Sequence, residues 1–186
     1  MKTSCWRIST RCLGDHELEQ AEDTVRCLAL PIVGESILVP NAVVAEVFAA
    51  NAVSPASDGP NWLLGSIAWR SSVLPLVSME AALGGARCEV GTRSKVVVMN
   101  VLSGNQSLKN YAVLVQGIPH QVLATEHTVA LDTPINGARP FVAADLRVEG
   151  ERAFIPDLDA VEEALLDVVD EWQIPASVDG EEDGVK

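Results

Sequence analysis

Cysteine is scarce in this chain of 186 residues, and its spacing forms no known motif. The four cysteines lie far apart, and none belongs to a C-x-x-C pair: Cys5, Cys12, Cys27 and Cys88. Disulfide frameworks and structural zinc sites both need cysteines at closer, regular spacing. The pattern therefore favours neither, and it fits the reduced thiols of a cytoplasmic protein.

Long hydrophobic runs are also absent, although 48% of the residues are apolar and the mean hydropathy is +0.20. A membrane-spanning helix needs about 20 consecutive apolar residues, and no segment approaches that length. The first 24 residues contain no apolar stretch of the kind that a secretory signal requires. We therefore expect a cytoplasmic protein that does not insert into a membrane.

Positive charge is the third shortage, with 13 Lys and Arg against 26 Asp and Glu and a formal net charge of −13. Nucleic-acid binders gain affinity from cations that neutralise phosphates, so this class is not favoured. The excess acid is concentrated in residues 157–186, which hold 11 acidic residues and one basic residue. We divide the chain into a flexible leader (1–24), a globular domain (25–172) and an acidic, disordered tail (173–186).

Motifs of the common enzyme classes are missing as well. No G-x-S-x-G elbow occurs, and no glycine-rich phosphate-binding pattern follows a predicted strand. The three histidines, His16, His120 and His127, have neither zinc-ligand spacing nor a neighbouring cysteine. We therefore expect a protein that is not an enzyme and that has no metal and no cofactor.

Valine is abundant in the globular region and favours strands over helices. Apolar runs bounded by turn residues predict strands over these segments: 25–33, 37–40, 43–48, 64–70, 73–78, 95–102, 111–117, 118–126 and 141–156. Tight turns are expected at Ser71-Ser72 and at Glu149-Gly150. The segments 51–60 and 127–140 are predicted to be loops.

A helix is predicted over 157–172, where Leu158, Val161, Leu165 and Val168 recur at helical spacing. The segment before it matches an earlier segment of the chain. Both run strand, turn, strand, proline and helix-like segment, with Leu74-Pro75 and Ile155-Pro156 at matching points. Two related β-units in one chain would explain this repetition, and chance is the alternative.

Trp62, Trp69 and Arg70 are the residues best suited to bind another protein, because Trp and Arg dominate the energetics of protein interfaces. Side chains of a strand over 64–70 alternate between its two faces. Trp69 is then expected to point into the core with Ile67, while Arg70 faces solvent. The alternative is that Arg70 merely pairs with a surface carboxylate.

Several motifs follow one another in an order found in one protein family. V-x-E-[VI] stands as Val44-Ala45-Glu46-Val47, and P-x-W-h-x-G, where h is apolar, stands at 60–65. A version of G-h-h-N-h-R-G follows at 65–71, and apolar-Pro-h-h-D-L has its counterpart at 74–79. The later segments KVVVMNV, YAVLVQGI and FIPDLDAV match the second half. From about Val25 to Leu166 the chain resembles the CheW-like domain, the scaffold module of bacterial chemosensory arrays.

The resemblance implies a mainly β fold of two intertwined small five-stranded β-barrels (SH3/OB-like), with short helices and a C-terminal helix. It implies an adaptor that couples the tip of a methyl-accepting chemoreceptor hairpin to the regulatory domain of a CheA-type histidine kinase, at membrane-associated arrays. By motif, the partner-binding residues are Val44, Glu46, Trp62, Gly65 and Arg70. Glu46 and Arg70 would supply oriented charge, and Gly65 would allow close backbone approach.

The central motif departs from the family pattern in two places. Ala68 replaces the family's Asn, and Ser71 replaces the Gly that follows Arg70. The segment around Trp69-Arg70 and LPLVSME resembles the ChpC-type auxiliary proteins of pilus-associated systems that control twitching. The departures leave two other hypotheses open. One is a degenerate modulator that binds the kinase without receptors, and the other is a small β-barrel enzyme or ligand binder.

Overall fold

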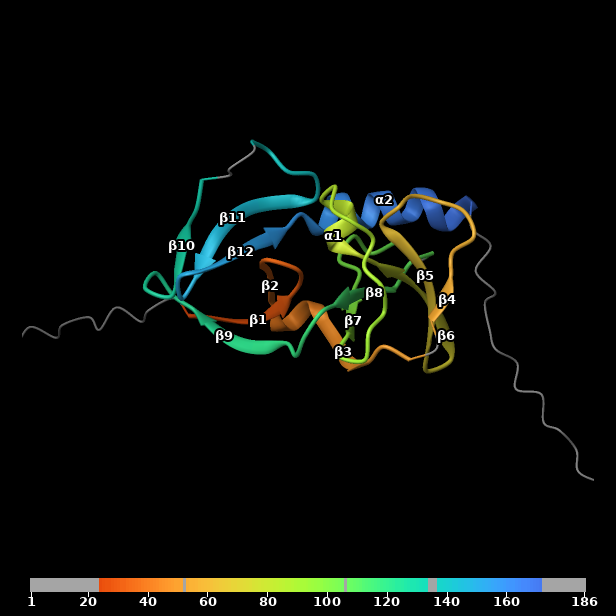
Figure 1. Ribbon diagram of the computed structural model, residues 1–186, viewed down its shortest axis with the longest axis horizontal. Helices are drawn as coiled ribbons and strands as arrows, with labels where there is room; N and C mark the ends of the chain where they lie inside the picture. Colours follow the sequence, from red (N-terminus) through yellow and green to blue (C-terminus); the bar gives the residue numbers. More distant parts are fainter. Residues whose placement is uncertain (1–23, 52, 106, 134–136, 172–186) are drawn as a thin grey trace, which may run out of the picture.

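The computed structural model describes residues 24–51, 53–105, 107–133 and 137–171. They form two six-stranded sheets, each curled into a barrel-like half of the molecule, and the halves lie side by side (Figure 1). This confirms the expected mainly β fold with a C-terminal helix. The predicted leader, apart from Thr24, and the predicted acidic tail lie outside the described residues.

The first sheet, barrel A, has the strand order β10-β11-β12-β2-β1-β9. Its strands are β1 (Val25–Pro31), β2 (Ser36–Pro40), β9 (His120–Ala124), β10 (Val129–Leu131), β11 (Val142–Val148) and β12 (Glu151–Pro156). All neighbours are antiparallel except β12 and β2, which pair in parallel. Barrel A therefore combines strands from both ends of the described chain.

The second sheet, barrel B, has the strand order β3-β7-β8-β6-β5-β4. Its strands are β3 (Val44–Ala49), β4 (Val53–Pro55), β5 (Leu63–Trp69), β6 (Ser72–Val77), β7 (Lys95–Asn100) and β8 (Asn110–Val115). Here the one parallel pair is β6 with β8. A 3-10 turn, η1 (Asn41–Val43), connects barrel A to barrel B.

Each sheet has six strands where five were expected, and the reason is the same in both. The two end strands of each sheet are consecutive in the chain, β9 and β10 in barrel A and β3 and β4 in barrel B. In each pair, one continuous stretch of chain bends and places one strand at each end of the sheet. Counted as one strand, each pair restores the five-stranded barrel.

The short strands β4 and β10 correct the sequence prediction, which placed loops over both segments. Each has only three residues, too few to show an alternating pattern, and each forms by pairing with the strand that follows it. The first predicted hairpin turn is also displaced by one residue. It lies at Arg70-Ser71, with Arg70 in the left-handed region at φ 53°.

Apolar side chains form three clusters. One fills barrel A around Cys27, Leu38 and Leu146, and another fills barrel B around Ile67 and Leu114. The third and largest lies between the barrels and receives side chains from both. It includes Leu30, Ile37, Met99, Tyr111, Phe154 and Leu165. This third cluster is a core shared by the two barrels, and it holds them together.

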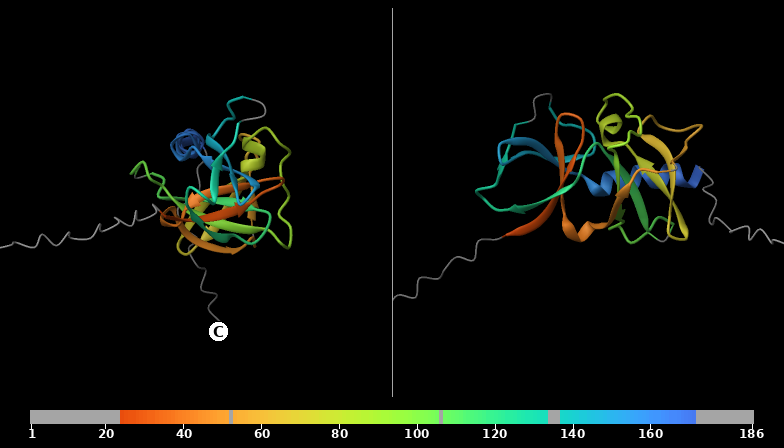
Figure 2. Two further views of the ribbon diagram at one scale, coloured as in Figure 1. Left: turned by 90° about the vertical axis from the view of Figure 1, so that its left-hand side faces the viewer. Right: turned by 60° about the horizontal axis from the view of Figure 1, so that its bottom comes forward.

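Two helices follow corresponding strands, α1 (Met79–Ala82) after β6 and α2 (Leu158–Glu171) after β12. The Ser78 hydroxyl caps α1 by accepting a hydrogen bond from the Ala81 amide, and Asp157 does the same for Ala160 in α2. Leu165 of α2 is fully buried in the shared core. Figure 2 shows α2 leaving barrel A and extending along barrel B.

The two β-units suggested by the sequence are real structural repeats. The first repeat runs from β1 to α1, and the second runs from β7 to α2, with the same order of pairings. Both contain a register shift at the same place, Leu63/Gly65 in β5 and Val142/Ala144 in β11. Both hairpin turns hold a residue at nearly the same φ, 53° at Arg70 and 52° at Glu149. These counterparts lie 79 positions apart in the sequence.

Candidate functional site

Three side chains meet on the surface of barrel B at one corner, where β3 passes the turn between β5 and β6. The indole N–H of Trp69 donates a hydrogen bond to Glu46 Oε2 over 2.9 Å. The Arg70 guanidinium lies 3.2 Å from the same oxygen and stacks over the Trp69 ring, 4.4 Å from its centroid. We call Glu46, Trp69 and Arg70 the docking cluster.

Local backbone structure explains why these side chains face outward together. A register shift in β3 between Val44 and Glu46 interrupts the alternation of inward and outward side chains. As a result Ala45, Glu46 and Val47 are all exposed. Arg70 occupies the hairpin turn itself, so its side chain leaves the end of the sheet. Trp69, at the last position of β5, is half-buried against the core of barrel B.

The cluster is too exposed to contribute much to stability. The Arg70 side chain is 69% exposed and that of Glu46 is 42% exposed. Surface ion pairs of this kind stabilise a fold by at most about 1 kcal/mol. An aromatic ring, a cation and a carboxylate held in a fixed geometry at the surface are, however, the groups that dominate binding at protein interfaces. The corner is therefore suited to recognition of another protein.

The sequence of both barrels matches one known protein family. The family model described as the CheW-like domain matches residues 26–165. The chain belongs to the CheW-like domain family. The match covers both barrels and most of α2. No curated protein matches the chain in sequence.

The fold comparison agrees with the family. The chain is similar to the scaffolding protein TtCheW from Thermoanaerobacter tengcongensis, with a TM-score of 0.58. The two share 14% sequence identity over 72% of this chain and 88% of that chain. At this identity the likeness concerns the CheW-like fold, and the chemistry of the docking corner has to be judged from this chain's own residues.

The structure brings together two of the five residues that the CheW-like motifs indicated, Glu46 and Arg70. Val44 begins the same strand but is half-buried and packs against the shared core. Trp69 was expected in the core, and the structure corrects this in part, because its indole N–H points to Glu46. In the sequence, the position of Trp69 directly before a hairpin turn and beside Arg70 indicated that its side chain could reach the surface.

Gly65 lies within β5, four positions before Trp69. It is buried in β5, with φ at +148°. A Cβ atom at this position would lie 2.0 Å from the backbone oxygen of Ser54 in β4. The close approach that the motif indicated is therefore an approach of β4 to β5 within this CheW-like domain. Contact between Gly65 and a partner stays a prediction.

Trp62 lies at a different place, at the junction of the two repeats. Its ring meets that of Phe141 edge to face, with centroids 6.3 Å apart. The two residues are counterparts in the repeats, and their carbonyl groups accept corresponding hydrogen bonds, from the Ser78 and Asp157 amides. Trp62 also packs against the shared core beside α2. A role in partner binding stays a prediction for Trp62.

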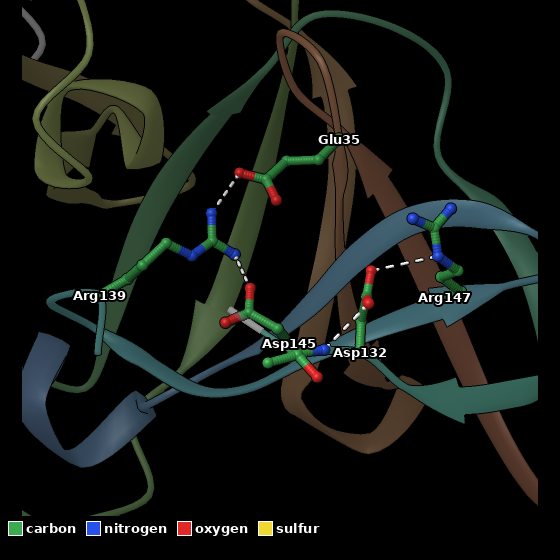
Figure 3. A network of polar contacts seen from close by, with 6 residues as sticks. Glu35, Asp132, Arg139, Asp145 and Arg147 are labelled. Carbon is green, nitrogen blue, oxygen red and sulfur yellow. Dashed lines mark hydrogen bonds and ion pairs between the residues drawn. The ribbon is translucent and has the colours of Figure 1, made fainter. Parts of the chain in front are cut away.

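A second polar network, in barrel A, was not indicated by any sequence motif (Figure 3). Arg139 pairs with Glu35 Oε1 over 2.6 Å and with Asp145, and its guanidinium stacks over Phe154. Burial by itself would lower the pKa of Arg139, but its hydrogen bonds and charge interactions with the two carboxylates raise it. The two carboxylate side chains are 15% and 11% exposed, and both are paired to the same guanidinium, so this network lies largely within the protein and ties the segment before β11 to β11 and to the loop between β1 and β2.

Chemistry beyond protein contact finds little support in the described part of the chain. It contains no group of three or more His, Cys, Asp and Glu residues placed to hold a metal ion. A groove of about 760 Å³ beside β4 is lined mainly by apolar groups, together with Glu89 and with Arg87, whose guanidinium is bound to the Leu64 carbonyl. Burial, and then the nearby charge of Glu80, raise the pKa of the Cys88 thiol in this groove. No described helix has the length and apolar character needed to cross a membrane.

Proposed function

We propose that this protein is a non-enzymatic adaptor that couples chemoreceptors to a CheA-type histidine kinase, and that the docking cluster binds the regulatory domain of the kinase. The observation that carries the proposal is the shared carboxylate oxygen of Glu46, which holds both the Trp69 indole and the Arg70 guanidinium in place. Membership of the CheW-like family supports the coupling role. The protein would act in the cytoplasm, at the receptor array.

The geometry gives each residue of the cluster a distinct part in binding. Trp69 offers the exposed part of its indole ring, and Arg70 offers hydrogen-bond donors that Glu46 does not use. Glu46 fixes both groups before binding, so a partner does not have to order them. Pre-organisation of this kind favours a small contact area centred on Trp69.

Titration calorimetry against the regulatory domain of the kinase from the same genome tests the proposal. We expect binding that Trp69→Ala weakens about 30-fold, or about 2 kcal/mol, as for a central interface residue. Arg70→Ala and Glu46→Ala should each weaken binding about tenfold.

The chain offers a matched control in Arg147 of barrel A, which is also partly exposed and pairs with Asp132 over 3.1 Å. Arg147→Ala should leave the affinity within about twofold of the unaltered protein, because the large energetic effects of truncation are confined to residues in the contacted patch. If a well-folded sample does not bind the kinase domain, or if Arg147→Ala weakens binding as much as Arg70→Ala, the docking cluster is not the binding site.

A second candidate function is a modulator that binds the kinase without engaging receptors. Ala68 and Ser71, which replace the Asn and Gly of the family motif on either side of Trp69-Arg70, favour it. Both are exposed at the docking corner, so both substitutions change the surface that a partner meets. Sedimentation with receptor hairpins, with and without kinase, separates the two candidates, since only the coupling adaptor sediments with receptors alone.

The likeness of the Trp69-Arg70 segment to ChpC-type proteins extends the proposal to pilus-associated systems that control twitching. Deletion of the gene, followed by measurement of surface motility and of swimming, tests this extension. Loss of surface motility with normal swimming would support a pilus-associated role. The reverse result would contradict it.

A further inference from the structure

The two barrels are assembled by an exchange between the repeats. Barrel A joins the hairpin β1–β2 of the first repeat to the four strands β9–β12 of the second. Barrel B joins the hairpin β7–β8 of the second repeat to the four strands β3–β6 of the first. Neither repeat alone therefore contains a complete barrel.

Four strand pairings connect the repeats, two in each barrel. They are β1 with β9 and β2 with β12 in barrel A, and β3 with β7 and β6 with β8 in barrel B. Separated from the second repeat, the first would expose all of these strand edges. Such edges are templates for pairing with another chain.

Each repeat also contains contacts that hold its own hairpin loop near its own helix. In the second repeat the buried carboxylate of Glu162 accepts hydrogen bonds from the Leu102 and Ser103 amides, at 2.8 and 2.9 Å. In the first repeat Glu80 accepts one from the Val33 amide at 3.4 Å. These contacts are independent of which copy of the other repeat completes the barrels.

The covalent connection between the repeats is the segment 83–94, which is mostly exposed. Figure 1 shows it running from α1, near the top of the view, to the start of β7 near the bottom. Arg87 anchors it to the first repeat through the Leu64 carbonyl, over 2.9 Å. Only its Leu83 and Cys88 side chains pack against the cores, at their edges, so the segment can open with little loss of core packing.

We propose that this chain forms an exchanged dimer with a second copy of itself, in which the first repeat of each copy completes its barrels with the second repeat of the other. Every strand pairing and the whole shared core are the same in the dimer as in the monomer, and only segment 83–94 changes its path. Glu46, Trp69 and Arg70 all belong to the first repeat, so each dimer carries two intact docking clusters. That such a dimer would bring two kinase domains together depends on the proposed function. The exchange of repeats does not depend on it.

Mass action sets when the dimer forms. In the monomer the connection holds the repeats at an effective concentration on the order of mM, which favours closure within one chain. Dimers therefore form when chains fold at high concentration. Once formed they persist on dilution, because return to the monomer requires all four inter-repeat pairings to separate.

Refolding of the full chain from denaturant at increasing protein concentration, followed by light scattering on a sizing column, tests the inference. The dimer fraction should rise with refolding concentration and remain after dilution. Monomer alone at every concentration would overturn the proposal.

A disulfide identifies exchange within such a dimer. Ser36 of β2 pairs with Ala153 of β12 across the repeat boundary. The double variant Ser36→Cys/Ala153→Cys can form a disulfide at this pairing. In an exchanged dimer the disulfide joins two chains. In a dimer of closed monomers it lies within one chain. Replacement of Cys5, Cys12 and Cys88 by Ser removes competing thiols, and Ser36→Cys alone is the control. Dimers whose bonds all lie within one chain would overturn the proposal.

Shortening the connection supplies a second variant. Deletion of residues 86–91 halves the segment and removes the Arg87 anchor, so closure within one chain becomes less favourable and we expect a larger dimer fraction at every concentration. A Gly-Ser insertion of equal length at the same place should remain monomeric. A folded monomer with the deletion would contradict the inference, and the refolding experiment decides the matter if the deletion variant does not fold.

Discussion

The docking corner of barrel B has a structural counterpart in barrel A, and the two differ in chemistry rather than in backbone. Arg70 and Glu149 occupy the same turn position with φ of 53° and 52°. Trp69, which precedes Arg70, is matched by Val148, which is buried. Strand register places His120 of β9 where β3 has Glu46. The same backbone therefore supports an exposed aromatic and charged cluster in one barrel and an ordinary turn in the other.

The duplicated fold thus supplies the position of each corner, and the side chains at that position decide its chemistry; under the proposed function, Glu46, Trp69 and Arg70 would supply the recognition. A scaffold protein needs a defined face toward each partner, and two identical corners would not distinguish them. Substitutions at paired positions of the two repeats test whether the barrels differ in stability and binding as their side chains indicate.

The largest loss of stability is expected on substitution of Gly65, whereas substitution of its counterpart Ala144 should have a small effect. Gly65→Ala places a Cβ 2.0 Å from the Ser54 oxygen at a φ of +148°, so we expect a loss of about 4 kcal/mol of unfolding free energy or failure to fold. Ala144→Gly should cost only about 1 kcal/mol, the usual penalty for glycine in a strand. Urea unfolding measures both. Equal effects would mean that the approach of β4 to β5 has no special requirement for glycine.

The buried glutamates of the two helices, Glu162 in α2 and Glu80 in α1, should differ in how much they stabilise the fold. Glu162→Ala removes the charged acceptor of two hydrogen bonds, from the Leu102 and Ser103 amides, and we expect a loss of about 3 kcal/mol of unfolding free energy. Glu80→Ala removes one longer amide contact and a hydrogen bond with the Ser78 hydroxyl, so the loss should be about 1.5 kcal/mol. Unfolding curves at equal pH decide the order. A larger loss at Glu80 would contradict this account of the two repeats.

Alkaline pH should distinguish Tyr111 from its counterpart Ile37 in the shared core. Burial, and then the charge of Glu162, raise the pKa of Tyr111 above its ordinary value of 10.0. Above pH 10 the unfolded chain releases this proton while the folded chain keeps it, so folding stability falls as pH rises. The slope from this group is about 1.4 kcal/mol per pH unit. Tyr111→Phe should show a shallower decline between pH 9 and pH 11, and an unchanged decline would assign it to other groups.

The smallest effect on stability is expected at the two turns. Arg70→Glu gives barrel B the charge of the barrel A turn, and it should change the unfolding free energy by less than about 1 kcal/mol. Kinase binding should nevertheless fall at least about tenfold, because the introduced carboxylate would repel Glu46 and release Trp69. Glu149→Arg is the matched control and should leave binding unchanged. Calorimetry combined with urea unfolding tests both variants, and equal binding losses would contradict the assignment of kinase binding to the docking cluster.

Much of the fold is predictable from local sequence pattern. The hairpin ending in Ser72–Val77 and the one around Glu149-Gly150 are marked by apolar strands and turn residues, and helix 157–172 is marked by its periodicity. The repetition around Leu74-Pro75 and Ile155-Pro156 reflects two true structural repeats. These features depend on residues close together in the chain, so a sequence pattern contains them.

The short strands and the docking cluster depend on distant contacts. β4 and β10 are too short to show a pattern and exist because each pairs with the following strand. The alternation in β5 placed Trp69 in the core, but the end of the strand turns its indole N–H toward β3. Glu46 and Arg70 are separated by 24 positions in the sequence, and only the curl of barrel B brings them within 3.2 Å.

Local sequence pattern is enough to predict the mainly β class, the repeated unit, the family and two residues of the docking cluster, because turn residues, apolar periodicity and ordered motifs act over short distances. The tertiary structure alone decided that the repeats exchange hairpins, that Trp69 joins Glu46 and Arg70, and that Trp62 packs at the repeat junction. These outcomes follow from sheet closure and from burial of one shared core, which depend on the whole chain at once.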